Sequence, residues 1–128
     1  MTVDGKDVVR NAGMAGISIL TRFGEFVANA AVPQAARVAA RDAVLDTVGV
    51  ALAGAAEPAA VRVRDVVSAE GGTSRCSVLG SNVRTGAGWA ALANGTAAHA
   101  LDFDDMCWVS LAPPRAPLVA AGLAAAEL

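Results

Sequence analysis

Ionisable side chains gather at one place in this sequence, between residues 89 and 127. This stretch holds the chain's one histidine, His99, and three aspartates within four positions, Asp102, Asp104 and Asp105. A carboxylate beside an imidazole can fix its tautomer and raise its basicity, which gives an acid/base pair that works near neutral pH. We therefore expect any chemistry of this chain to be done by this stretch.

His99 and Asp102 lie three residues apart and share a face if the helix that carries His99 continues to Asp102. In that arrangement the two side chains form an acid/base pair that can work near neutral pH, so His99 and Asp102 are the candidate catalytic residues. The alternative is a partly buried histidine that is satisfied by a local hydrogen bond, which is a common structural arrangement. Both interpretations stay open at this point.

The three aspartates repel one another, so we expect something to compensate their charge. One of them could cap a helix, the group could coordinate Mg²⁺, or one carboxyl could have a raised pKa. Arg115 is the one cation that follows them in the sequence. It could bind a substrate carboxylate through two hydrogen bonds, or pair with Asp104 or Asp105. Asp105 and Arg115 are therefore the candidate substrate-binding residues.

The composition indicates a helical protein. Apolar residues make up 55% of the chain and charged residues 17%, against about 45–50% and about 25% in typical domains. Aromatic residues are only 4%, so small aliphatic residues provide the apolar content. Alanine is the strongest helix former. So little charge predicts that part of the apolar surface faces another domain or subunit.

Several classes of function are disfavoured. A net charge of −2 without a basic stripe predicts no nucleic-acid partner. No uncharged apolar run reaches the ~18 residues of a membrane span, and no signal segment begins the chain. Cys76 and Cys107 are too few for a disulfide framework and lack metal-ligand spacing, so we expect two buried thiols. A cytoplasmic protein without a membrane partner is predicted.

The apolar periodicity predicts an all-α domain over residues 17–128, after a loose leader over residues 1–16. Residues 75–84 are expected to form at most one short hairpin. Residues 102–117 are expected to form a loop over the site. The last helix shows no stop signal, so we expect it to run to the last residue and the chain to be the front part of a longer protein. Helices are expected over residues 17–30, 33–53, 58–69, 86–101 and from 117 onward.

Four local features refine these expectations. Gly49 inside the second helix is typical of close helix packing. Asn94-Gly95 predicts a bend in the fourth helix. Trp108 is expected to anchor the loop by hydrophobic contact. The apolar stripe of the second helix is formed by Val38, Leu45, Val48 and Leu52.

Three blocks of the sequence, in order, resemble the N-terminal helical domain of the MmgE/PrpD family. They read LDTVGVALAGA at 45–55, AALANGTAAHALDFDD at 90–105 and APLVAAGLAAAE at 116–127. The specific one is the block NG-x-x-x-H-x-x-D-x-DD, and the resemblance covers roughly residues 18–128. The family includes 2-methylcitrate dehydratase, cis-aconitate decarboxylase and iminodisuccinate epimerase.

The resemblance implies an all-α domain that, in the family, is followed by a second, α+β domain. Family members are typically homodimers that act on small di- and tricarboxylates without a metal or organic cofactor. Their site lies between the two domains. It uses the first aspartate of the D-x-DD block, here Asp102, a histidine in the following loop, and histidine and lysine residues from later in the chain.

The sequence departs from this pattern in the loop. Met106 stands where the family often has threonine, and residues 113–117 read Pro-Pro-Arg-Ala-Pro where the family typically has His-Pro-Ser-Ala-Pro. Pro113 thus replaces the loop histidine and cannot shuttle a proton. The resemblance implies a fragment of a carbon–oxygen or carbon–carbon lyase that is inactive alone. The alternative is a non-catalytic helical module that pairs with itself or with a separately encoded second half.

Overall fold

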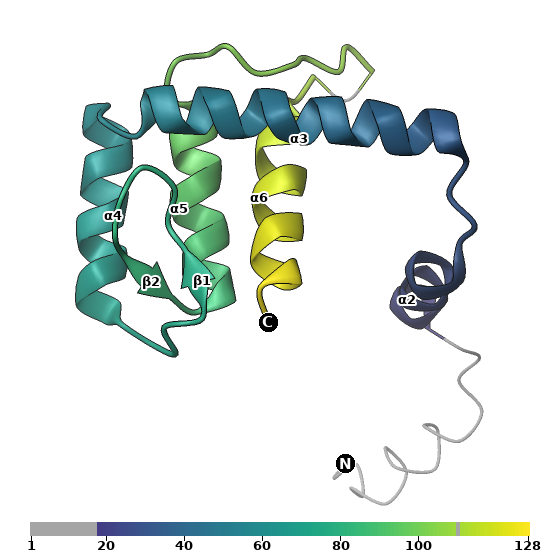
Figure 1. Cartoon of the computed structure of the whole chain (residues 1–128), viewed down its shortest axis with the longest axis horizontal. Coiled ribbons are helices and arrows are strands. Elements are labelled where there is room, and N and C mark those ends of the chain that lie inside the picture. The colour runs from purple at the N-terminus through teal and green to yellow at the C-terminus, as the bar shows by residue number, and fades with distance from the viewer. Residues whose placement is uncertain (1–17, 110) are drawn as a thin grey trace, which may run out of the picture. The chain divides into compact units, whose positions relative to one another are not determined.

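The computed structural model of the chain describes residues 18–109 and 111–128, so the expected leader over residues 1–16 lies outside the described residues. The chain divides into two compact units, Met1–Gln34 and Ala35–Leu128. The predicted all-α fold is confirmed, because the described residues form helices and one two-stranded hairpin (Figure 1). The elements are α2 (Ile19–Asn29), α3 (Gln34–Gly54), α4 (Pro58–Glu70), β1 (Cys76–Ser77), β2 (Arg84–Thr85), α5 (Ala87–His99) and α6 (Arg115–Ala126).

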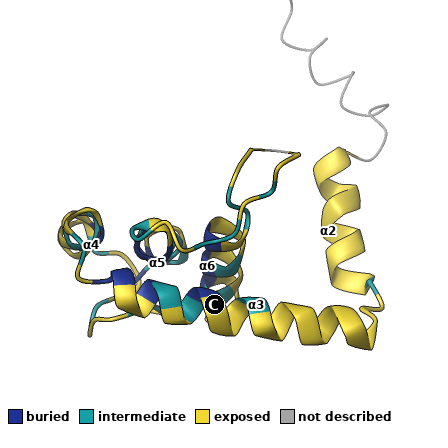
Figure 2. Cartoon of the chain, turned by 90° about the horizontal axis from the view of Figure 1, so that it is seen from above, coloured by how far each residue is buried: buried dark blue, intermediate teal, exposed yellow. Residues whose placement is uncertain are grey.

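The first unit contains α2, which begins at the expected cap. The Ser18 Oγ atom accepts the backbone N–H of Thr21 at 3.1 Å, and this bond satisfies one of the free donors of the first turn. Phe23 and Phe26 are both exposed, and no residue of α2 is buried (Figure 2). The helix therefore presents an amphipathic surface whose apolar side is open among the described residues.

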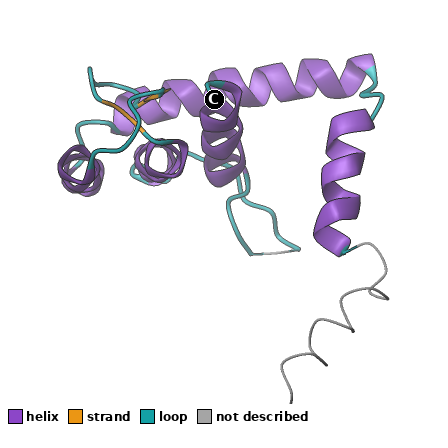
Figure 3. Ribbon diagram, turned by 90° about the horizontal axis from the view of Figure 1, so that it is seen from below, coloured by secondary structure: helices purple, strands orange, loops and turns teal. Residues whose placement is uncertain are grey.

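In the second unit, α5 stands between α4 and α6 and contacts both, while α3 passes across one end of this row (Figures 1 and 3). The axes of α3 and α4 differ by 91°. The hairpin expected near residues 75–84 is present and lies against α4 and α5. Its antiparallel register places Cys76 opposite Thr85 and Ser77 opposite Arg84. These elements hold the end of α5, where the candidate catalytic residues lie.

Alanine forms most of the core. One buried cluster joins α3, α4, α5 and α6 through side chains that are all alanine. Small side chains allow helix backbones to approach closely, as Gly54 shows: a Cβ atom there would lie 2.2 Å from the carbonyl oxygen of Ala97. The members of this cluster are Ala51, Ala60, Ala97, Ala98 and Ala116.

The face of α3 that packs differs from the predicted apolar stripe. Its buried residues are Thr47, Ala51 and Gly54, whereas Leu45 and Leu52 are 72% and 52% exposed. Gly49 is not at a close contact either, because a Cβ atom there would meet nothing within 4 Å. The physical reason is the close crossing with α5, which admits small side chains only. The larger side chains of Leu45 and Leu52 do not take part in this crossing and are exposed.

The expected bend at Asn94-Gly95 is absent, since α5 is continuous from residue 87 to 99. Asn94 is buried, and its amide bonds the hairpin: Nδ2 donates to the Ser77 carbonyl at 2.9 Å and Oδ1 accepts the Leu79 N–H at 2.8 Å. An asparagine breaks a helix when its side chain competes for the local backbone. Here the side chain has distant partners, so Asn94 joins the hairpin to α5.

The last helix begins two residues before its expected start and does not run to the last residue. An Asp105 carboxylate oxygen accepts the backbone N–H of Arg115 at 3.0 Å, which sets the start of α6. Pro117 then falls in the first turn, where a helix needs no N–H from it. At the other end, α6 stops at Ala126, and the Glu127 carboxylate accepts the N–H and Oγ–H of Ser77.

The two cysteines of the chain differ in burial. Cys76 is buried, and its Sγ–H donates to the Ala124 carbonyl at 3.3 Å. Cys107 is only half-buried, so the expected pair of buried thiols is wrong for this residue. None of the described helices is by itself long and apolar enough to cross a membrane; α3 and α4 meet the criterion only as a bent pair, on length and composition.

Candidate functional site

The candidate site lies where α5 ends. The helix stops at His99, so the expected helical face shared by His99 and Asp102 does not form. Instead the Asp102 N–H donates to the His99 carbonyl at 3.0 Å, and Asp102 adopts the left-handed region with φ 55°. Aspartate enters this region more readily than most L-residues. The tight turn at Asp102 directs the following residues back toward the helix end.

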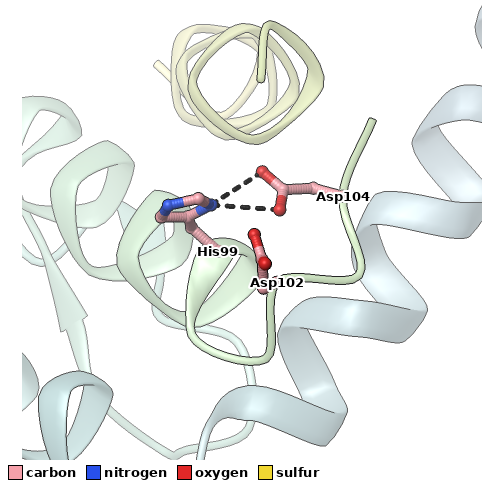
Figure 4. Close-up of side chains that lie close together, drawn as sticks. All are labelled: His99, Asp102 and Asp104. Atoms are coloured by element: carbon pink, nitrogen blue, oxygen red, sulfur yellow. Dashed lines mark hydrogen bonds and ion pairs between the residues drawn. The ribbon is translucent and has the colours of Figure 1, made fainter. Parts of the chain in front are cut away.

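His99 pairs with Asp104 rather than with Asp102 (Figure 4). The Nδ1 atom of His99 lies 3.0 Å from Oδ1 and 2.9 Å from Oδ2 of Asp104. The Asp104 side chain is 5% exposed, whereas the His99 side chain is 56% exposed. A shielded carboxylate therefore holds an imidazole that remains open to solvent on its other side.

Asp102 lies beside this pair. One carboxylate oxygen of each aspartate and one ring nitrogen of His99 all lie within 4.8 Å of one another. Figure 4 shows the Asp102 carboxylate directed toward Asp104. Mg²⁺ is usually held by one or two carboxylates and completes its shell with water. The coordination of Mg²⁺ therefore stays one of the alternatives for this group of side chains.

The two candidate substrate-binding residues contact each other. The Nε atom of Arg115 lies 3.6 Å from Oδ2 of Asp105, and Nη1 lies 3.3 Å from Oδ2 of Asp46 on α3. Asp105 also accepts the first N–H of α6, so of the alternatives weighed for the aspartates, helix capping is what the structure shows for this one. Asp46 is a partner that sequence reasoning missed, because 69 residues separate it from Arg115 without any local signal. Their role toward a substrate stays a prediction.

His99 also lines an open groove of about 640 Å³. His99 is the one titratable residue that lines it, among the described residues, and neither Asp102 nor Asp104 does. Pro113 also lines the groove, so the position that the resemblance gives to a loop histidine has no proton to exchange. The remaining lining residues are small or apolar apart from Thr96: Ala59, Ala91, Leu92, Gly95, Ala100, Ala112, Ala116 and Pro117.

Comparison with known proteins gives one match. Residues 19–128 match the family model of the MmgE/PrpD N-terminal domain. This span includes every described helix and all residues of the cluster at the end of α5. No curated protein and no solved structure matches the chain. The match therefore concerns the domain and carries no substrate or reaction with it.

Proposed function

Because the chain belongs to the MmgE/PrpD family, whose N-terminal domain it matches over residues 19–128, we propose that it supplies part of a lyase active site. The reaction is the breaking of a carbon–oxygen or carbon–carbon bond in a small di- or tricarboxylate such as 2-methylcitrate or cis-aconitate. The observation that supports this proposal is the grouping of His99, Asp102 and Asp104 at the end of α5. His99 and Asp102 are the acid/base groups.

The charge balance of the site supports the proposal that the chain is inactive by itself. Removing a proton next to a carboxylate creates negative charge that positive groups or hydrogen-bond donors must stabilise. Among the described residues, Arg115 is the cation that pairs with one of the three aspartates, Asp105, and it pairs with Asp46 as well. A substrate with two or three carboxylates then needs cations from a second domain or chain. No metal or organic cofactor is part of the proposal.

The proposal also covers compartment and partners. The proposed location is the cytoplasm, because two cysteines are too few for the disulfide framework of a small secreted domain. The net charge of −2 offers no basic surface for nucleic acid. The expected partners are therefore the small anionic substrate and a second protein domain or subunit.

The test is the turnover of 2-methylcitrate and cis-aconitate by the protein purified from its native cell, with whatever chain or domain accompanies it. We expect Asp102→Asn and His99→Gln to lower kcat by at least about 100-fold, the usual contribution of general acid–base catalysis. Asp65→Asn, which removes an exposed carboxylate from α4, is the matched control and should leave kcat unchanged. If Asp102→Asn keeps the kcat of the wild type, the proposed catalytic role of Asp102 is contradicted.

A second candidate function is a non-catalytic helical module that forms a homodimer or pairs with a separately encoded second half. The observation that favours it is the number of large apolar side chains on the surface. Trp108 and Val109 in the loop after the cluster are 80% and 98% exposed, and Leu118 of α6 is 70% exposed. Trp108 therefore does not anchor the loop as expected, and covering these side chains would gain hydrophobic free energy.

Sedimentation of the purified chain tests this second function. We expect a dimer that binds a dye for exposed apolar surface less strongly than its dissociated form. Leu118→Glu should weaken the association, whereas Ser68→Glu on the exposed side of α4 should not. A stable monomer that binds no such dye would exclude the module, whatever the result of the turnover assay.

A further inference from the structure

We propose that Asp104 is a positioning residue that holds His99 in the Nδ1–H tautomer, so that Nε2 is the ring atom that exchanges a proton with the substrate. The inference rests on the proposed function for its catalytic consequence, but the tautomer itself can be measured without any substrate. Asp104 stands outside the pair of candidate catalytic residues, His99 and Asp102, that the sequence indicates.

Both carboxylate oxygens of Asp104 face one nitrogen of the His99 ring. The two oxygens of Asp104 lie at nearly equal distances, 3.0 and 2.9 Å, from Nδ1 of His99. An ionised carboxylate only accepts hydrogen bonds, so Nδ1 must carry the hydrogen. A neutral imidazole has one N–H, and its other nitrogen then carries the lone pair. Nε2 is therefore the basic atom of this ring.

The two nitrogens of the His99 ring have different surroundings. The Asp104 side chain is 5% exposed, so it is shielded from the solvent that would otherwise compete for the bond. Figure 4 shows the second ring nitrogen pointing away from both carboxylates. His99 also lines the groove of about 640 Å³, which neither aspartate lines. A reactant in this groove would contact His99 without contacting Asp104.

The turn at Asp102 gives the two aspartates different positions relative to His99. The left-handed conformation at Asp102, with φ 55°, brings Asp104 to the ring while leaving Asp102 exposed. When Nε2 takes a proton from carbon, its lone pair forms the N–H bond and the carbon–hydrogen electron pair stays on the substrate. The ring then becomes an imidazolium, and the adjacent Asp104 carboxylate stabilises that charge.

The experiment is ¹⁵N NMR of the histidine ring in the full chain, above the pH range in which an ordinary imidazole titrates. His99 is the one histidine in the sequence, so its two ring nitrogens give the signals without ambiguity. We expect the proton-bearing signal on Nδ1 in the wild type. In Asp104→Ala we expect the Nε2–H form to become the major one. Asp102→Asn is the matched control and should keep the proton on Nδ1.

A wild-type ring with its proton on Nε2 would overturn the inference, and so would an Nδ1–H ring in a folded Asp104→Ala chain. If Asp104→Ala does not fold, the wild-type spectrum decides by itself between the two tautomers. The outcome is separate from the proposed lyase function. If the ring carries its proton on Nδ1 but His99→Gln leaves turnover unchanged, Asp104 still positions the ring. In that case His99 has no catalytic role.

Discussion

At the scale of single residues, Asp102 carries a conformational demand as well as a chemical one. Its φ of 55° lies in the region that L side chains rarely adopt, and the turn it makes is what brings Asp104 to His99. Aspartate and asparagine enter this region most readily after glycine, because their short polar side chains can bond the local backbone. A substitution here therefore changes the backbone unless the side chain is chosen with care.

We expect Asp102→Asn to change the free energy of unfolding by less than about 0.5 kcal/mol, because asparagine tolerates the left-handed conformation. Asp102→Val should cost about 1–2 kcal/mol, because its branched Cβ crowds the backbone there. Denaturant unfolding of the two variants measures the difference. If Asp102→Asn and Asp102→Val lower the free energy of unfolding equally, the left-handed conformation at residue 102 does not determine the cost of a substitution there.

At the scale of elements, one buried side chain joins the hairpin to α5 by hydrogen bonds. Asn94 is buried and bonds the backbone of Ser77 and of Leu79. Its removal would leave one acceptor and one donor of the hairpin without a partner in a partly buried place. Apolar contacts also hold the hairpin, since Val78 packs with Ala93 and Cys76 packs with Ala90 of α5, but Asn94 supplies the side-chain hydrogen bonds from this helix.

We expect Asn94→Ala to lower the free energy of unfolding by about 2–4 kcal/mol, since each unsatisfied buried group costs about 1–3 kcal/mol. Thr96→Ala, on the same helix, removes a bond to the carbonyl four residues earlier and should change stability by less than about 0.5 kcal/mol. Thermal or denaturant unfolding of both variants checks the contrast. Similar losses would mean that Asn94 does not connect the two elements.

Two glycines of α3 give a second test at this scale. Gly54→Ala would place a Cβ atom 2.2 Å from the carbonyl oxygen of Ala97, so we expect a loss of about 1–3 kcal/mol from the forced separation of α3 and α5. Gly49→Ala meets no atom within 4 Å and should stabilise the helix by about 0.5–1 kcal/mol. If the unfolding midpoints of Gly54→Ala and Gly49→Ala move in the same direction, the face of α3 that packs on α5 has been assigned wrongly.

At the scale of the whole molecule, the end of α6 is joined to the hairpin across 50 residues of sequence. The backbone N–H and then the hydroxyl of Ser77 donate to the Glu127 carboxylate and lower its pKa, with a smaller contribution from Arg84. A lowered pKa in the folded state means that the unfolded chain binds the proton more readily. Glu127 therefore stabilises the fold above the ordinary glutamate pKa, and this contribution disappears as the pH falls.

We expect Glu127→Gln to be less stable than the wild type above about pH 4.3, the ordinary glutamate value. The difference should close as the pH falls through the lower pKa of the folded state, because protonated Glu127 then resembles glutamine. Unfolding free energies measured across this range test the sign. Glu70→Gln on α4 is the charge-matched control, and a difference that grows toward low pH would contradict the assignment.

The sequence by itself determined the helical class, the order of the helices, the place of the hairpin and the location of the ionisable cluster. These depend on near neighbours: alanine content, apolar periodicity, and the glycines and prolines between helices. The blocks that resemble the MmgE/PrpD family lie in these same elements, which is why the family assignment needed no coordinates. Element ends were predicted within a few residues for the same reason.

Only the tertiary structure decided the partners. His99 meets Asp104 because Asp102 turns the chain, Asn94 meets residues 77 and 79 in the hairpin, and Arg115 meets Asp46 across 69 residues. The packing face of α3 was mispredicted because a close crossing selects small side chains, while a periodicity argument selects large ones. A pairing between distant segments depends on where several helices cross, and no local pattern of residues contains that information.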